Sequence, residues 1–320
     1  MKNIRISAFT FLRNAVDYDL PFVESISSAL PIVDEYIVAL AHSSDATEEK
    51  LLQIETDKLK IISTDWIPEV YTRNTEYARQ TDLAKAHCTG HWLLYLQGDE
   101  VLHEEDHSKI MRAIRKAHEH RDVEGILFNF LHFWADYRHV HRSHTWYKKE
   151  IRLIRNLPEI HSWRDAQSFR FFHIPPKSPA DYLSKHHSRK LRVIDSSIRI
   201  FHYGHVKKIE LQHKKVQDAA NTFYQNKKTI SFDFGNIHNV PLYIGTHPAV
   251  MKDRIAEFEK NQAHPSFKNK PNPKLHKHER LKYRLLSWVE NTFFGGRQLF
   301  GFKNFTLLSK ACELKEKFKI

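Results

Sequence analysis

The chain passes from an apolar run, Trp92-Leu93-Leu94-Tyr95-Leu96, directly into a short polar motif, Gln97-Gly98-Asp99-Glu100. The run predicts a strand that is apolar on both faces. Such strands are typical of a parallel sheet that helices cover on both sides. The two acids would then stand at the carboxyl end of the strand, the edge where open α/β sheets bind their ligands.

The segments before this run alternate between strand-like and helix-like patterns. Strands are predicted over residues 4–11, 35–40 and 59–63, and helices over residues 22–30, 48–54 and 74–87. This alternation indicates an α/β fold, a three-layer α/β/α sandwich around a mixed, mainly parallel central sheet.

The pattern changes after a predicted helix over residues 107–118. Five strands follow without intervening helices, over residues 125–133, 150–155, 168–173, 191–194 and 198–203, which indicates hairpin additions to a mixed sheet. Beyond His205 the chain is predicted to be mainly helical. We therefore expect a catalytic domain over residues 1–205 and a helical, basic C-terminal extension over residues 206–320.

Charge separates the same two parts. The formal net charge is +12. Residues 1–205 carry 28 basic and 28 acidic residues, whereas residues 206–320 carry 22 basic and 10 acidic ones. The extension is thus expected to meet an anionic membrane surface, nucleic acid or an anionic substrate, and charge alone does not choose among them.

Cysteine content and hydropathy exclude several protein classes. Two cysteines, Cys88 and Cys312, are too few for a disulfide framework or a Cys-rich zinc site. No apolar run reaches the roughly 18–20 residues of a membrane span, and the N-terminus lacks the apolar stretch of a signal peptide. These features predict a soluble protein facing the cytoplasm.

Two common phosphate-binding motifs are missing from the sequence. No GxGxxG follows the first predicted strand, and no GxxxxGK[ST] occurs. A phosphorylated ligand would need another source of positive charge. A divalent metal held by carboxylates after the fourth strand is the physical candidate, because hard cations share oxygen ligands with phosphates.

Three segments together resemble the family 2 glycosyltransferases of the GT-A fold, in a bacterial subgroup that builds cell-envelope polysaccharides. They are Ile6 to Asn14, Tyr95 to Glu104 and His202 to Val206, and the turn Ser43-Ser44-Asp45-Ala46-Thr47 agrees with them. The resemblance covers about residues 1–205. It implies an inverting transfer of sugar from a nucleotide diphosphate sugar, most often a UDP-sugar, with Mn²⁺ or Mg²⁺ as cofactor.

The resemblance also implies roles on the donor side of the site. Nucleotide-binding roles fall to Thr10, Arg13, Asp45 and Gln97. Metal-binding roles fall to Asp99, with Glu100 and the distant His202 as further ligands. The motif departs from the family pattern at Gln97, where the family has a first Asp.

On the acceptor side, the resemblance points to the segment His161 to Gln167. Asp165 is the predicted base that takes the proton of the acceptor hydroxyl. Trp163 is predicted to stack on a sugar ring, and Arg164 or Arg170 to pair with phosphate oxygens.

Each of these residues also has a plainer interpretation. Asp99 and Glu100 would suit the first turn of a helix, and Asp45 would suit a turn that bonds its own backbone. Asp165 could be a surface acid, and His202 a buried histidine of the sheet. The basic aromatic stretch over residues 281–302 would either lie on an anionic bilayer or pack on the body of the protein.

The favoured function is a metal-dependent, inverting glycosyltransferase that acts on a cell-envelope glycan or a lipid-linked acceptor. It would work in the cytoplasm, with peripheral contact at the inner face of the membrane, and not on nucleic acid. A sugar-nucleotide nucleotidyltransferase is disfavoured because no Gly-rich loop follows the first strand. A non-catalytic basic binding module and a transferase fold that binds sugar nucleotide without turnover remain open.

Overall fold

The computed structural model describes residues 4–224, 232–261, 276–301 and 303–308. The first part of the chain forms β1 (Ile6–Leu12), α1 (Phe22–Ala29), β2 (Glu35–Ala41), α2 (Thr47–Leu52), β3 (Leu59–Thr64), α3 (Thr75–Ala86), β4 (Trp92–Tyr95), β5 (Glu100–Leu102) and α4 (His107–Glu119). The middle part forms β6 (Gly125–Trp134), β7 (Val140–His141), β8 (Lys149–Arg155), β9 (Ile160–Trp163), β10 (Ser168–Phe172), α5 (Pro179–Leu183), β11 (Ser188–Ile194) and β12 (Arg199–His205). The last part forms α6 (Ile209–Tyr224), α7 (Lys252–Lys260), α8 (Leu281–Phe293) and β13 (Phe305–Leu307).

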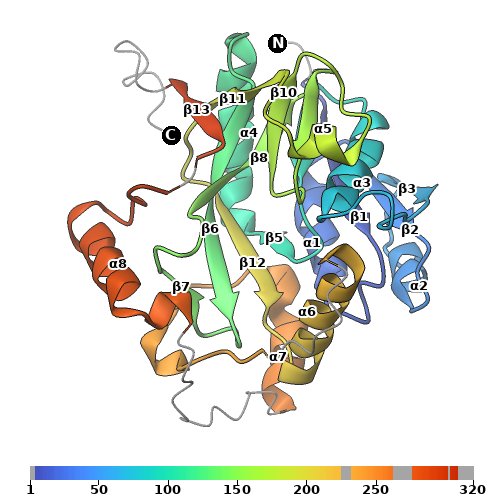
Figure 1. Ribbon diagram of the computed structural model, residues 1–320. Coiled ribbons are helices and arrows are strands. Elements are labelled where there is room, and N and C mark those ends of the chain that lie inside the picture. Colours follow the sequence, from blue (N-terminus) through green and yellow to red (C-terminus); the bar gives the residue numbers. More distant parts are fainter. Residues whose placement is uncertain (1–3, 225–231, 262–275, 302, 309–320) are drawn as a thin grey trace.

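One mixed sheet runs through the described residues in the order β3-β2-β1-β4-β8-β6-β11-β10-β9 (Figure 1). Strands β3, β2, β1 and β4 are parallel, and β8 is antiparallel to both β4 and β6. Strand β12 pairs in parallel with β6. The carboxyl ends of β1 to β4, β6 and β12 therefore lie at one edge of the sheet.

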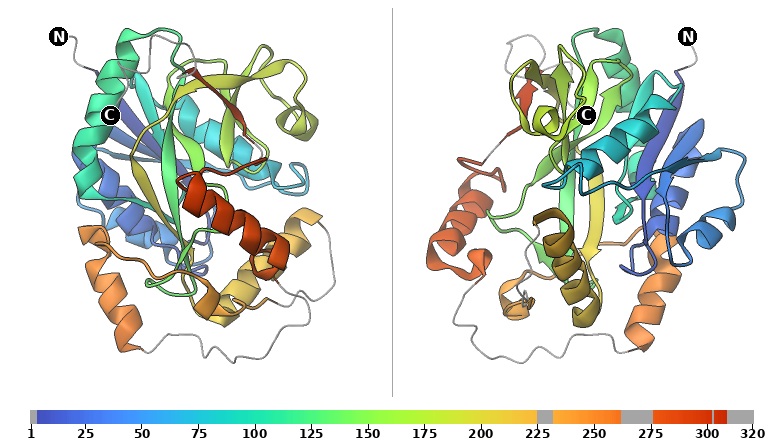
Figure 2. Two further views of the ribbon diagram at one scale, coloured as in Figure 1. Left: turned by 90° about the vertical axis from the view of Figure 1, so that its left-hand side faces the viewer. Right: turned by 45° about the vertical axis from the view of Figure 1, so that its right-hand side comes forward.

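Helices cover both faces of this sheet. Residues of α1, α2 and α4 pack in one apolar cluster with Ile6, Leu12 and Trp92, whereas Ala84 of α3 packs in a second cluster with Phe9 on the opposite face. The left view of Figure 2 has α4 on one side of the sheet and α3 on the other. The predicted α/β architecture with helices on both faces of a mixed sheet is confirmed.

The three-residue strand β5 was not predicted from the sequence. It pairs antiparallel with β12, and its register sets Glu100 opposite His202. Two motifs that lie about 100 residues apart in the sequence are thereby held side by side. This pairing brings the acidic motif and the late histidine to the same edge of the sheet.

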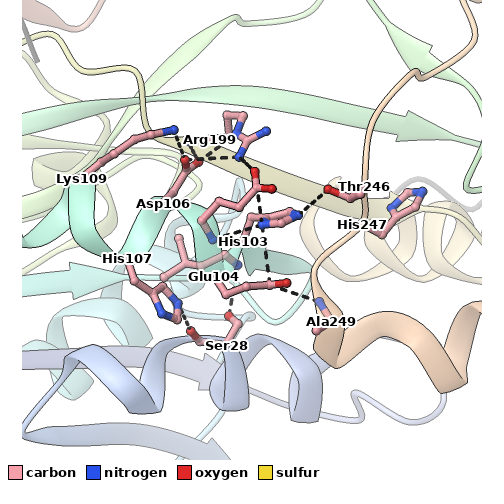
Figure 3. Close-up of polar contacts among 12 residues, drawn as sticks. Ser28, His103, Glu104, Asp106, His107, Lys109, Arg199, Thr246, His247 and Ala249 are labelled. Carbon is pink, nitrogen blue, oxygen red and sulfur yellow. Dashed lines mark hydrogen bonds and ion pairs between the residues drawn. The ribbon is translucent and has the colours of Figure 1, made fainter.

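The C-terminal part contacts the sheet at several points. Strand β13 pairs in parallel with β11. The segment before α7 is fixed to the turn after β5: His103 Nε2 lies 3.0 Å from Thr246 Oγ1, and Ala249 N donates to Glu104 Oε2 at 3.1 Å (Figure 3). In the described part of the chain, no helix has the length and apolarity to cross a membrane.

Candidate active site

A cavity of about 390 Å³ opens at the carboxyl edge of the sheet. Its volume lies in the range of small-ligand pockets. The residues that line it come from the end of β1, from the segments after β1, β3 and β4, from the start of α3, from the segment before β8, from the loop after β9 and from α6. These segments are far apart in sequence, and the parallel strands bring their ends together.

Aromatic rings line one side of the cavity. Phe11 and Tyr77 stack with ring centroids 5.4 Å apart, and Trp66 lies 5.7 Å from Tyr77. The guanidinium of Arg13 lies 5.4 Å from the centroid of the Trp66 ring. Flat rings beside a cation suit a planar heterocycle with a negatively charged substituent.

Asp99 lines the cavity and pairs with His202, which does not itself line it. Asp99 Oδ2 lies 3.7 Å from His202 Nε2, and both side chains are nearly buried. Burial opposes ionisation of Asp99, but the charges of His202, Lys215 and Lys207 outweigh it and lower the pKa of Asp99. Burial also lowers the pKa of His202, which favours the neutral imidazole that ligates metals.

This pair fits a divalent cation. Two ligands of one ion, each about 2.1 Å from it, lie less than about 4.2 Å apart, and the Asp99 and His202 atoms satisfy this limit. A Cβ at Gly204 would lie 2.9 Å from His202 Nε2 and would also collide with Asp99 Oδ2, so the glycine leaves room at this point. Among the described residues, no three His, Cys, Asp or Glu side chains are grouped for a metal. An ion here would take its other ligands from water and phosphate.

The structure gives Glu100 a different partner from the predicted metal. Both of its carboxylate oxygens accept hydrogen bonds from Arg152, at 2.6 and 2.7 Å, and both side chains are fully buried. The prediction of Glu100 as a metal ligand is corrected on this ground. Gln97, by contrast, lines the cavity.

Of the residues predicted on the acceptor side, the structure places only Asp165 at the cavity. Asp165 is exposed and lines the cavity together with Gln167 and Tyr147. Trp163 is only 3% exposed, so it has no face for a sugar. Arg170 is buried and donates to Asn304 Oδ1 at 2.7 Å and to Ser188, which removes it from phosphate binding.

Arg164 is exposed but does not line the cavity. Its guanidinium lies 4.2 Å from the centroid of the Trp163 ring. The backbone of Arg164 has a φ of 59°, which belongs to the tight turn between β9 and β10. The turn directs Asp165, and not Arg164, into the site.

Two predicted nucleotide contacts are also corrected. Thr10 is 1% exposed and does not line the cavity. Asp45 accepts hydrogen bonds from the backbone N–H groups of Asp17 and Thr47 and from the Thr47 hydroxyl, at 2.7, 3.0 and 2.5 Å. Asp45 therefore fixes the loop after β1 against the start of α2. This agrees with the alternative interpretation of Asp45 as a turn residue that bonds nearby backbone groups.

Several lining residues were not singled out from the sequence, namely Tyr18, Trp66, Tyr77, Lys215 and Asp218. Trp66 lies two residues beyond the end of β3, a position comparable to those of Arg13 after β1 and Gln97 after β4. Lys215 lies in a basic helical run that carries no motif.

No protein-family model matches the chain, and no curated protein matches it in sequence. Among solved structures, S. aureus TarS 1-349 matches with 13% identity and a TM-score of 0.37, over 90% of this chain and 78% of that one. TarS 1-349 in complex with UDP-GlcNAc matches with 15% identity and a TM-score of 0.32, over 43% of this chain and 37% of that one.

Glucosyl-3-phosphoglycerate synthase from Mycobacterium tuberculosis, in complex with Mn²⁺, UDP and phosphoglyceric acid, matches with 18% identity and a TM-score of 0.28, over 41% of this chain and 44% of that one. In these two complexes the match spans about two fifths of the solved chain.

Proposed function

We propose that the protein is a metal-dependent, inverting glycosyltransferase. It transfers a sugar from a nucleotide diphosphate sugar, with UDP as the favoured nucleotide, to a hydroxyl of a cell-envelope glycan or a lipid-linked acceptor. One observation carries the proposal: Asp99, which is paired with His202, and Asp165 line the same cavity as an aromatic wall. The cavity thus combines residues that would hold a cation, an exposed carboxylate and aromatic rings on which a base would stack.

The donor would lie with its base on the side of Phe11, Trp66 and Tyr77, beside Arg13. Its diphosphate would lie at the Asp99 end. A divalent ion held by Asp99 Oδ2 and His202 Nε2 would stabilise the charge that develops on the departing diphosphate.

Asp165 acts on the acceptor in this proposal. Its carboxylate accepts the proton of the attacking hydroxyl, and the hydroxyl oxygen forms a bond to the anomeric carbon. The bond from that carbon to the diphosphate oxygen breaks, and its electron pair leaves with the nucleoside diphosphate. Attack from the face opposite the leaving group inverts the anomeric centre.

Helix α8 supports contact with an anionic membrane surface. Its polar side faces the body, where His144 contacts both Glu290 and Ser287. Leu281, Leu285 and Trp288 recur at helical spacing and are 79%, 60% and 56% exposed. An exposed apolar stripe on a basic segment suits an anionic bilayer. Failure to sediment with phosphatidylglycerol vesicles at low salt would refute this part of the proposal.

Calorimetric titration with UDP, GDP and dTDP, each with Mn²⁺ and then with EDTA, tests the donor assignment. We expect Mn²⁺-dependent binding of UDP that Asp99→Asn abolishes. Asp195→Asn is the matched control, because Asp195 pairs with Lys149 outside the cavity. The Asp165→Asn variant should keep UDP binding and lose transfer. A protein that binds none of the three diphosphates refutes the proposal and favours the basic binding module.

A further inference from the structure

Helix α6 forms a wall of the cavity and is fixed to the loop after β1. Lys214 pairs with Asp17 at 2.9 Å, and the Tyr18 hydroxyl donates to Asp218 at 3.0 Å. Just before the helix, Lys207 Nζ donates to the backbone oxygen of Tyr18. In Figure 1, α6 lies at the end of the sheet toward which the arrows of β6 and β12 point. The helix is thus held at the edge where the ligand would bind.

Lys215 is the cationic side chain that α6 contributes to the cavity. Its Nζ lies 3.6 Å from Asp99 Oδ2, and its side chain is 34% exposed. The charge of Lys207 also acts on Asp99. Lys207 is fully buried, however, and its ammonium donates to the backbone oxygen of Tyr18. Lys215 is therefore the lysine of this pair that can reach a ligand.

The charge around Asp99 exceeds what one carboxylate balances. The positive charges of Lys215 and of the buried Lys207 act on it, and the neighbouring Glu100 is paired with Arg152. The surplus is positive, and Lys215 is the lysine that brings it to the cavity. A diphosphate is the part of a nucleotide sugar whose charge matches this surplus.

We infer that Lys215 is a cationic anchor for the diphosphate of the donor, in addition to the divalent ion proposed at Asp99 and His202. The inference rests on the proposed function and extends it to a residue outside every sequence motif. In the free protein Asp99 holds the ammonium in the cavity. The flexible four-carbon stem lets the ammonium move from Asp99 to a phosphate oxygen, where it acts as a point charge on the leaving group.

The test compares Lys215→Met with Lys214→Met by calorimetric titration of the full chain. The two variants remove the same charge from adjacent positions, and only Lys215 lines the cavity. With Mn²⁺ present, Lys215→Met should weaken UDP binding roughly tenfold or more, the size of one charge-assisted hydrogen bond. Its affinity for uridine, which has no phosphate, should stay within about twofold of wild type.

Lys215→Arg should recover part of the UDP affinity, because it keeps the charge. Equal UDP binding by Lys215→Met and wild type would overturn the inference while leaving the proposed function standing. A parallel loss of uridine binding would overturn it too, since it would mean that the variant damages the cavity wall. If wild type binds neither UDP nor uridine, the proposed function fails and the inference fails with it.

Discussion

Arg152 donates two hydrogen bonds to Glu100 in the protein interior, from Nε to Oε2 at 2.7 Å and from Nη2 to Oε1 at 2.6 Å. The same guanidinium donates to the backbone oxygen of Gln167 at 2.9 Å, and Glu100 Oε2 accepts from the Gln97 backbone N–H. Gln97 and Gln167 both line the cavity. The ion pair therefore ties together two sides of the site without facing the ligand.

Removing either partner should destabilise the fold. A buried charge left without its partner costs about 3–5 kcal/mol, so Glu100→Gln and Arg152→Met should each lower the free energy of unfolding by about that amount. The double variant should lose clearly less than the sum of the two. Urea denaturation of all four proteins measures this coupling. The exposed pair of Lys149 and Asp195 is the control, and its disruption should cost about 0–1 kcal/mol.

Gly204→Ala should disable the cation site while leaving the fold intact. The added methyl would lie 2.9 Å from His202 Nε2 and would collide with the Asp99 carboxylate, so these two groups must move apart. We expect UDP binding to lose its dependence on Mn²⁺ and to weaken by roughly tenfold or more, as after loss of a charged contact. A variant with wild-type Mn²⁺ dependence and an unchanged melting temperature would contradict this site.

Sequence reasoning found the sheet because apolar runs and helix periodicity are local signals. It also singled out Arg13, Gln97, Asp99 and Asp165, which follow strand ends or lie in a short motif and which line the cavity. The sequence-based predictions failed for residues whose role depends on whether the side chain is buried. Trp163 is of a residue type that commonly stacks on sugars, yet its side chain is buried where β9 pairs with β10.

Glu100 illustrates a second limit of the sequence. Its partner Arg152 lies 52 residues away on β8, and no spacing rule connects the two. Lys215 was not singled out, because the sequence of a basic run does not show which lysine faces a cavity. Contacts between distant segments, and not local propensity, determine these roles.

Trp66→Ala should weaken binding of the base and spare binding of the diphosphate. Stacking of a base on an aromatic ring is worth about 1–3 kcal/mol, so the affinities for UDP and for uridine should both fall roughly tenfold. Affinity for inorganic diphosphate with Mg²⁺ should not change. Trp163→Phe is the control, because Trp163 is buried outside the cavity. Loss of diphosphate binding in Trp66→Ala would instead indicate a collapsed cavity.

Glu150 on β8 should make the protein less stable as the pH rises. Burial raises the pKa of Glu150 to about 7, the charges of Asp165 and Glu100 add to this effect, and Arg152 opposes it. One of its oxygens, Oε2, is buried without a hydrogen-bond partner. The carboxyl is therefore easier to protonate in the folded chain than in the unfolded one, where its pKa is about 4.3.

The sign follows from proton binding. Between pH 4.3 and 7 the folded state holds a proton that the unfolded state has released, so the stability from this group is fully present below about pH 4.3 and is lost as the pH rises through 7. Glu150→Gln should remove this decline, and its stability relative to wild type should increase by about 2–3 kcal/mol between pH 4.5 and 8. The slope is the diagnostic quantity, because any packing cost of the amide is the same at every pH.

Glu35→Gln provides the opposite case for comparison. Burial works against the Glu35 carboxylate, but hydrogen bonds from Lys60, Ser7 and Thr89 outweigh it and lower the pKa to about 2. Its contribution to stability is present above about pH 4.3 and is lost as the pH falls toward 2, so Glu35→Gln should destabilise the protein equally at pH 6 and pH 9. Urea titrations from pH 4.5 to 9 distinguish the two carboxyls. A flat difference between Glu150→Gln and wild type over that range would show that Glu150 is already ionised in the folded protein, with water or a cation reaching it from the cavity.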